Sequence, residues 1–394
     1  MTGIQKIIIF LNYFGVGLFI PVLSLFLLSH GCNLQSLAIV VGFYSVTVMI
    51  SEVPSGLYAD MKGRKTAFYL SCAFVAASLF MMYFAQNIPL LIIGIVFFGL
   101  GRAFLSGSLD SLIIEDCIHR NGDAALSAVT SANLVSQCAG IAIGSLIGGF
   151  LPNVSGYFLH VILRLIVLLA VIFLSALFLK EFTSSKEKQK TLISQTHMMM
   201  TLLKRKRQLR IIMLCIFGSS ITLFALETYW QPQFTTLISP KQHYLLGVLC
   251  ACGYGGNMLG SFLTGRIKMS DQVRRWRYYF LFVVLLGLSL CIVAVQNTAL
   301  GFMLSFILVQ TILGIANVPE QTLLNSLASN ETRASLLSVS SLFSQLAGIL
   351  SSIICALLIL HIEVSGVFLL MGSLSAIIAV TASLLLKLDQ KFEV

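Results

Sequence analysis

The residues of this chain that could do chemistry are charged side chains placed inside long apolar runs. Asp110, Glu227 and Glu320 each stand within such a run, as do Glu52 and Arg102. A charged group in hydrocarbon is costly unless it faces a cavity or a partner. A carboxyl group that loses its water also takes up a proton more readily. These acids are therefore candidates for proton or cation handling, and Arg102 is a candidate to tune them.

Polar and aromatic side chains accompany two of these acids. Tyr229 and Trp230 follow Glu227, and their rings could hold a cation by cation–π contact. Asn317 comes shortly before Glu320. We predict that Tyr229, Trp230 and Asn317 line a substrate cavity. The alternative for the two rings is an aromatic belt at the membrane interface.

Three polar residues of one apolar run are spaced by four. Arg102, Ser106 and Asp110 would share a broad face of a continuous helix at this spacing. Such a face must look into a cavity or at partner side chains. The spacing favours cavity lining, and an internal salt-bridge network is the alternative.

The composition identifies the class of protein. Of the 394 residues, 57% are hydrophobic and 10% are charged, and the mean hydropathy is +0.94. A chain this apolar is an integral membrane protein. The net charge of +10 could suggest a nucleic-acid partner, but the basic residues collect in short loops between apolar runs. That distribution is the positive-inside pattern, so no nucleic acid is expected.

A spanning helix needs about 20 apolar residues. The chain has twelve runs of this kind, which predict an all-α polytopic fold: 5–28, 37–59, 67–85, 89–115, 126–150, 156–179, 209–236, 243–266, 277–295, 299–328, 334–360 and 363–387. Every Lys and Arg except Arg102, Arg164 and Lys241 falls in the tails or in alternate loops. This bias predicts a multi-pass protein with both termini in the cytoplasm. Pro232 is expected to break its helix near the outer end.

One basic segment divides the chain. Residues 181–208 carry many Lys and Arg with apolar residues at roughly helical spacing. We predict a cytoplasmic linker with an amphipathic helix that binds anionic lipid head groups, and a calmodulin-type target helix is the alternative. It separates six-helix bundles at 1–180 and 209–394. The halves repeat weakly, since Ser-Gln-x-Ala-Gly occurs at 136–140 and again at 344–348. Such repeats bind substrate between them near the midplane.

A short charged segment at residues 56–65 joins two predicted spans. It reads Gly-Leu-Tyr-Ala-Asp-Met-Lys-Gly-Arg-Lys. It resembles the signature loop of the major facilitator superfamily of secondary transporters, Gly-x-Leu-Ala-Asp-Arg-x-Gly-Arg-(Arg/Lys), with Met61 in place of the usual Arg. The residues that keep the family spacing are Gly56, Asp60, Gly63 and Arg64. Gly63 would let the chain reverse, and Gly56 would let another helix approach closely.

The resemblance implies a conformational latch. In the family, an acid at the cytoplasmic end of the fourth helix pairs with the Arg of the loop. Here Glu115 and Asp116 stand at that end, so with Asp60 and Arg64 they would form the latch, supported by the two loop glycines. Family members with a Glu-x-Pro-(Ser/Thr)-Gly run also keep an acid at Glu52. Gating and proton handling are equally open for it.

Other segments resemble drug-efflux-like members of the same superfamily. Residues 99–110 are similar to their fourth-helix run, and residues 325–338 are similar to the hinge before their eleventh helix. Residues 140–149 resemble the drug/proton antiporter signature Gly-x-x-x-Gly-Pro-x-x-Gly-Gly, but Ser145 stands where Pro is expected. Glycines at this spacing make a smooth face for helix packing.

The resemblance covers the whole chain. It implies a monomeric secondary transporter of the cytoplasmic membrane that exports a small amphipathic compound in exchange for protons by alternating access. An importer or facilitator of a metabolite is the first alternative, and a non-transporting sensor on the same fold is the second. The sequence shows no nucleophile motif, phosphate-binding loop or metal cluster, so we expect neither an enzyme nor a cofactor. The nine Cys are scattered and are expected to pack as small hydrophobes.

Overall fold

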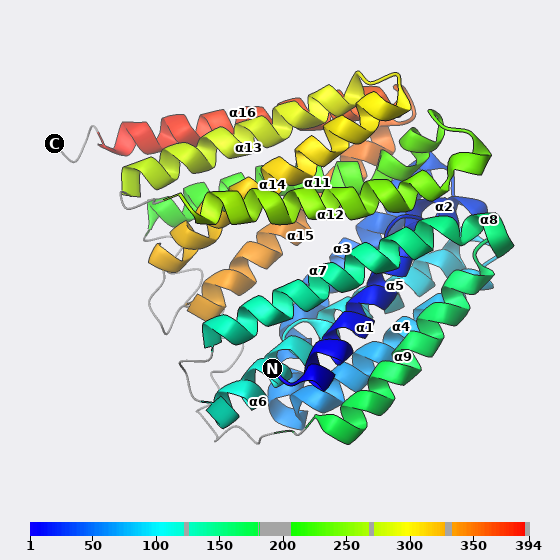
Figure 1. The fold of residues 1–394 in the computed structure, drawn as a ribbon. Coiled ribbons are helices and arrows are strands. Elements are labelled where there is room, and N and C mark those ends of the chain that lie inside the picture. Colours follow the sequence, from blue (N-terminus) through cyan, green and yellow to red (C-terminus); the bar gives the residue numbers. More distant parts are fainter. Residues whose placement is uncertain (122–125, 180, 182–205, 268–271, 328–332, 391–394) are drawn as a thin grey trace. The chain divides into compact units, whose positions relative to one another are not determined.

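The structure is a computed structural model that describes residues 1–121, 126–179, 181, 206–267, 272–327 and 333–390. All of its regular elements in these ranges are helices (Figure 1). The chain forms two compact units. Unit 1 comprises Met1–Glu187 and Ile238–Tyr254, and unit 2 comprises Lys188–Leu237 and Gly255–Val394. The predicted linker at 181–208 lies almost wholly outside the described residues.

Unit 1 begins with a bent span. Helices α1 (Gly3–Phe19) and α2 (Leu23–Ser29) meet at 47° and together are long and apolar enough to cross a membrane. The other helices of the unit are α3 (Leu34–Lys62), α4 (Arg64–Tyr83), α5 (Ile88–Leu105), α6 (Leu109–Asn121), α7 (Leu126–Phe150), α8 (Pro152–Ser155) and α9 (Phe158–Phe178). The pairs α1–α7, α4–α5, α3–α5 and α1–α9 pack side by side.

Glycines of α7 bring its backbone against α1. A Cβ at Gly140, Gly144 or Gly148 would overlap backbone atoms of α1, including carbonyl oxygens of Phe10, Phe14 and Leu18. The predicted smooth face is therefore present, and its partner is the first helix. On the other side of α7, Gly149 lies against the backbone of Gly247, at the start of α12 (Tyr244–Gly265).

The run predicted as one helix at 89–115 is two helices. α5 ends at Leu105 and α6 begins at Leu109, although the two together form a single apolar span, Ile88–Cys117. Gly107 lies between them with φ +71°, a left-handed conformation that favours glycine. Arg102, Ser106 and Asp110 therefore do not share one continuous helix face, contrary to the prediction.

Unit 2 is built from the remaining spans. It contains α11 (Arg207–Thr235), the second half of α12, α13 (Gln272–Ala294), α14 (Ala299–Leu327), α15 (Arg333–Leu358) and α16 (Val364–Gln390). Short 3-10 helix η2 (Pro240–Gln242) precedes α12. α13 packs on α14 and α16, and α11 packs on α15 and α16 (Figure 1). Pro232 does not break α11, which continues to Thr235, because a proline in the last turn displaces few backbone hydrogen bonds.

The two units use the same helix pairs. The first and fifth spans pack together in each, as α1–α7 and as α11–α15, and so do the third and fourth, as α4–α5 and as α13–α14. The repeated Ser-Gln-x-Ala-Gly segment lies on α7 and on α15, the fifth span of each set. Among the described residues, eleven helices are long and apolar enough to cross a membrane, or twelve with the bent pair α1–α2. The predicted all-α polytopic fold is confirmed.

Candidate functional site

Asp110 is held by neutral partners from two other helices. The Tyr13 hydroxyl, on α1, donates a 2.9 Å hydrogen bond to Asp110 Oδ2. The Asn133 amide, on α7, donates to Oδ1 at 3.3 Å. Asp110 also lies in the first turn of α6, where the helix dipole favours a negative charge. The structure thus places this carboxylate at the junction of α1, α6 and α7.

Arg102 is not a direct partner of this carboxylate. Its side chain is exposed, and its guanidinium group is within hydrogen-bonding reach of the Tyr44 hydroxyl on α3. The Tyr13 hydroxyl is close enough to interact electrostatically with both Arg102 and Asp110. Within unit 1, no ion pair joins Arg102 to a described acidic residue. The break at Gly107 interrupts the helix between the two charges.

Glu320 has a similar environment in unit 2. The hydroxyl of Tyr279, a side chain with no exposed surface, donates a 2.8 Å hydrogen bond to Glu320 Oε2. Cys215, which is also fully buried, lies near the same carboxylate. The three residues come from α13, α14 and α11. Glu320 itself is only half-buried, so it remains accessible from one side.

Glu227 differs from its neighbours on α11. Its side chain is exposed, while Tyr229 and Trp230 are 0% and 1% exposed. The carboxylate lies near Gln310 of α14 and near the Trp230 indole, but the indole nitrogen has no hydrogen bond of acceptable geometry. The Trp230 ring packs instead on Phe306, with centroids 4.9 Å apart.

The predicted cavity lining is therefore wrong for the two aromatic residues. Tyr229 and Trp230 belong to the packed interior of unit 2, because α11 buries most of its circumference. Asn317, in α14, is half-buried. Glu52 is half-buried in α3, where its carbonyl accepts a hydrogen bond from Ser55.

The loop of the signature segment contacts α6. Arg64 Nη2 lies 2.7 Å from Glu115 Oε1, and Arg64 Nη1 donates to the Gly107 carbonyl at 3.1 Å. Arg64 therefore binds both the helix break and the helix that follows it. Gly63 has φ +100° and joins α3 directly to α4, as a reversing glycine should. Asp60 is exposed.

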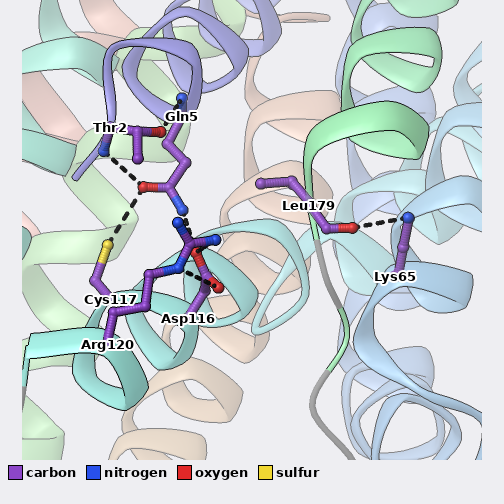
Figure 2. A network of polar contacts seen from close by, with 7 residues as sticks. All are labelled: Thr2, Gln5, Lys65, Asp116, Cys117, Arg120 and Leu179. Atoms are coloured by element: carbon purple, nitrogen blue, oxygen red, sulfur yellow. Dashed lines mark hydrogen bonds and ion pairs between the residues drawn. The ribbon is translucent and has the colours of Figure 1, made fainter.

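Two members of the predicted latch behave differently. A Cβ at Gly56 would meet no atom of the described chain within 4 Å, so no helix packs closely there. Asp116 does not reach Arg64. It is 1% exposed, pairs with Arg120 at 2.8 Å and accepts a hydrogen bond from Gln5 of α1 (Figure 2). Glu115 and Asp116 are adjacent on a helix, so their side chains point in different directions.

Sequence reasoning missed several residues of these clusters. Tyr13, Tyr279 and Asn133 hold the membrane carboxylates, but a tyrosine or asparagine in an apolar run gives no sign of its partner. Lys65 Nζ donates to the carbonyls of Ala176 and Leu179 at the end of α9. Figure 2 shows the bond to Leu179. The Glu181 carboxylate accepts a 3.1 Å hydrogen bond from the backbone N–H of Lys65.

Arg164 is a buried membrane arginine whose partner the sequence did not indicate. Its side chain is 5% exposed and donates to the Asn12 carbonyl at 3.2 Å. It lies directly against Gly15 of α1, where a Cβ would overlap the guanidinium group. Among the described residues, no cluster of three or more His, Cys, Asp or Glu could hold a metal ion.

Comparison with known families decides the class of this protein. The family model described as Major Facilitator Superfamily matches residues 7–267 and 211–393. The chain belongs to the Major Facilitator Superfamily. Members of this superfamily are transporters, so the fold is that of a membrane carrier of small molecules.

Curated relatives lie within the same superfamily. The chain is 23% identical over 269 residues to YxaM of Bacillus subtilis (strain 168), an uncharacterized MFS-type transporter, and this match spans 67% of the chain and 65% of YxaM. It is 27% identical over 147 residues to the quinolone resistance protein NorA of Staphylococcus aureus (strain Mu50 / ATCC 700699), with 37% of each chain covered. The chain thus aligns with less than two thirds of either relative.

Solved structures share the superfamily fold. The nucleoside transporter NupG superimposes with a TM-score of 0.79 at 14% identity, covering 98% of this chain and 100% of NupG. A POT family transporter in complex with a thioalcohol-conjugated peptide superimposes with a TM-score of 0.78 at 12% identity, covering 99% and 96%. At these identities the likeness shows the fold alone. The chain is thus a multi-pass membrane protein with the fold of this superfamily, and its membrane carboxylates lie within that fold.

Proposed function

We propose that this transporter exports a small amphipathic compound in exchange for protons, by alternating access of a central site. The observation that carries the proposal is the way the membrane carboxylates are held. Asp110 is bonded by Tyr13 and Asn133, and Glu320 by Tyr279. The ion pairs described within the units, Arg64–Glu115 and Arg120–Asp116, involve neither of them.

Neutral donors suit a group that must gain and lose a proton. A carboxylate bound to an arginine would have to lose that ion pair each time it is protonated. A carboxylate bound to a phenol or an amide keeps its partner after protonation, because both partners can accept as well as donate. The energetic difference between the two protonation states is then small enough for a transport cycle.

The two acids of unit 2 lie at different depths. Glu227 is 20 residues from the start of α11, about 30 Å along the helix, while Glu320 is only 7 residues, about 10 Å, from the end of α14. If the basic loops mark the cytoplasm, Glu227 lies towards the outer side and Glu320 towards the inner side. We infer that protons enter at Glu227 and leave by way of Glu320 and Tyr279.

Arg64 and Glu115 supply the gating part of the proposal. Their side chains are 29% and 40% exposed, and such pairs contribute about 0–1 kcal/mol. A contact this weak can break in every cycle. Because Arg64 also binds the Gly107 carbonyl, opening the latch would release the break beside Asp110. This arrangement would connect the proton-handling residue to the cytoplasmic gate, with Asp60 at its edge.

The first experiment is the accumulation of a lipophilic cationic dye in cells that express the protein, with and without a proton uncoupler. We expect low dye levels that recover when the uncoupler is added. Glu227→Gln should abolish this gradient-dependent export while expression stays intact. Glu363→Gln, which removes an exposed acid in the turn before α16, is the matched control and should export normally. Unchanged export by Glu227→Gln would refute the assignment of Glu227.

A second candidate is an importer or facilitator of a narrow range of metabolites. Ser145 replaces the proline of the antiporter signature, and the fold neighbours include a nucleoside transporter and a peptide-binding carrier. Dye levels that do not respond to expression would favour this candidate. Metabolite profiling of expressing cells would then identify the compound that accumulates.

The placement in the cell is also part of the proposal. The proposed state is a monomer in the bacterial cell membrane. The proposed cytoplasmic placement of both termini agrees with the positions of Lys65, Glu115 and Arg120 at one end of unit 1. Anionic lipid head groups are the proposed partners of the basic segment at 181–208.

A further inference from the structure

Arg102 stands at the middle of a membrane span. The span Ile88–Cys117 has 30 residues, and Arg102 is 14 residues from its start and 15 from its end. The first distance is about 21 Å along α5, and the second crosses the break at Gly107 into α6. The hydrocarbon core is about 30 Å thick, so the guanidinium group cannot reach either interface by extending along the helix. An exposed arginine at this depth needs an anion or a water-filled cavity beside it.

Among the described residues of unit 1, no acid forms an ion pair with this guanidinium group. Asp110 is the nearest acid on the same span, but it is engaged with Tyr13 and Asn133 and forms no ion pair with Arg102. The guanidinium is within reach of the neutral Tyr44 hydroxyl, and its side chain remains exposed. An arginine has five N–H donors in a planar fork, so Tyr44 leaves several of them open.

The side chains around the Arg102 guanidinium group would suit an amphipathic ligand. The Tyr44 ring lies against Phe98, with centroids 5.8 Å apart. Next to them, Thr47 of α3 packs directly on Gly99 of α5. An aromatic wall beside a guanidinium group matches a compound that joins an apolar ring to an oxyanion, because the planar fork binds a carboxylate through two parallel hydrogen bonds.

We propose that Arg102 is an anion-binding residue of the substrate site, so that the transported compounds include ones with a carboxylate beside an apolar part, and that Tyr44 orients the guanidinium. This inference rests on the proposed export of amphipathic compounds and names one chemical class among them. The depth of Arg102 argues against a lipid phosphate as the natural anion, since head groups lie at the membrane surface.

The test is ligand-induced thermal stabilisation of the purified protein in a lipid-free neutral detergent. The free cysteines, most of them buried, allow unfolding to be followed with a thiol-reactive dye. The probes are 1-naphthoate, 1-naphthamide and 1-naphthylmethylamine, which share one ring system and differ in charge. We expect millimolar naphthoate to raise Tm by about 2–4 °C, and the amide and the amine to have no such effect.

Variants assign the effect to the fork. Arg102→Gln should abolish the shift, Arg102→Lys should leave a smaller one because the charge remains without the fork, and Tyr44→Phe should reduce it. Arg266→Gln is the matched control, since Arg266 is an exposed arginine at the end of α12 that lies over Phe262. It should respond to naphthoate as the wild type does.

Three results with the naphthalene probes would overturn the inference. One is an equal shift in Arg102→Gln, and another is an equal shift with the amide. The third is a wild type that no naphthoate concentration up to the solubility limit stabilises. A further arm adds phosphatidylglycerol to the detergent. If this lipid removes the naphthoate shift by occupying Arg102, the anion is a head group and the inference also fails.

The outcome is separate from that of the proposed function. The measurement uses no proton gradient and no direction of transport, so Arg102 can fail as an anion receptor while dye export remains coupled to protons. Conversely, carboxylate binding at Arg102 can hold while the uncoupler experiment fails, which would indicate a carrier of acidic metabolites.

Discussion

The hydroxyl of Tyr279 donates a 2.8 Å hydrogen bond to the carboxylate of Glu320. It is the counterpart of the 2.9 Å bond from Tyr13 to Asp110. Asp110 and Glu320 both lie on the fourth span of their six-helix set, and in each unit a phenol from another helix holds the acid. The repeat that appears weakly in sequence is thus also a repeat in how the membrane acids are supported.

Tyr279→Phe tests this support. A hydrogen bond to a charged group contributes about 1.5–3 kcal/mol, so its loss should disfavour the ionised form of Glu320. We expect slower transport and a displaced pH profile, measured as dye export against external pH. The matched control is Tyr278→Phe, whose ring stacks on Phe282 and which should keep the wild-type profile. Identical profiles for both variants would show that the Tyr279 hydroxyl has no role in proton handling.

The latch predicts a separation of activity from stability. Glu115→Gln removes an exposed ion pair, which should lower the free energy of unfolding by about 0–1 kcal/mol. Transport should nevertheless fall several-fold, because Arg64 then has only the Gly107 carbonyl to hold. The exchange Arg64→Glu with Glu115→Arg should restore part of the activity. Equal loss of Tm and activity, with no recovery in the exchange, would indicate a purely structural pair.

The glycines of α7 predict a contrast in stability. Gly144→Ala would push a Cβ into the carbonyl of Phe14, and overpacking of this kind costs about 1–3 kcal/mol. Its Tm in detergent should therefore fall by several degrees. Gly56→Ala places the same methyl group in open space and should change stability by less than about 0.5 kcal/mol. A stable Gly144→Ala protein would mean that α1 and α7 are less closely packed than described.

The contact between Gly15 and Arg164 predicts coupling between two substitutions. Gly15→Ala alone should destabilise unit 1, because the new Cβ would overlap the Arg164 guanidinium. In an Arg164→Ala background the same change should cost little, since the obstructing group is gone. A double-mutant cycle on Tm measures this difference. Additive effects would contradict the direct contact.

Cys32 gives a prediction on pH outside the spans. It lies in the turn between α2 and α3 and is 8% exposed, and burial raises the pKa of its thiol despite a hydrogen bond with Ser36. The folded pKa is then above the unfolded one. This contribution to stability is present below the unfolded pKa and is lost as pH rises through the folded value. The thiolate is scarce at neutral pH, so a maleimide should react slowly and faster at higher pH.

The test of Cys32 uses a variant in which the other cysteines are replaced by serine. The native protein should label several-fold more slowly than the same protein unfolded in denaturant. Cys32→Ser in that background controls for labelling at other groups. Rapid labelling of the native protein at pH 7 would show that the thiol is not buried.

The sequence predicted the spans well because each apolar run is long enough to cross a membrane. The bend at residues 20–22 did have a signal, since Pro21 lies in it, although the run 5–28 was predicted as one helix. The break at residues 106–108 could not be predicted, because it contains no proline and Gly107 resembles the other glycines of its span until its positive φ is seen. The faces of α11 were equally hidden, since a helix apolar all round has no periodicity to show that Trp230 is inside and Glu227 outside.

The candidate site was predictable in residue type but not in pairing. Membrane acids stand out by composition, so Asp110, Glu227 and Glu320 could be named. Their partners could not, because Tyr13 lies 97 residues from Asp110 in the chain. Which of the two adjacent acids, Glu115 or Asp116, pairs with Arg64 depends on how α6 is rotated about its axis. The sequence does not give that rotation.

The two ends of the 182–205 segment leave from fixed points. Glu181 is bound to the start of α4, and Lys206 Nζ donates to the Leu327 carbonyl at the end of α14 at 3.0 Å. Each of the two chain ends is therefore hydrogen-bonded to a helix of its own six-helix set. A cut between the two points would remove no bond between described residues, so the gene could be divided there and its two products made as separate polypeptides.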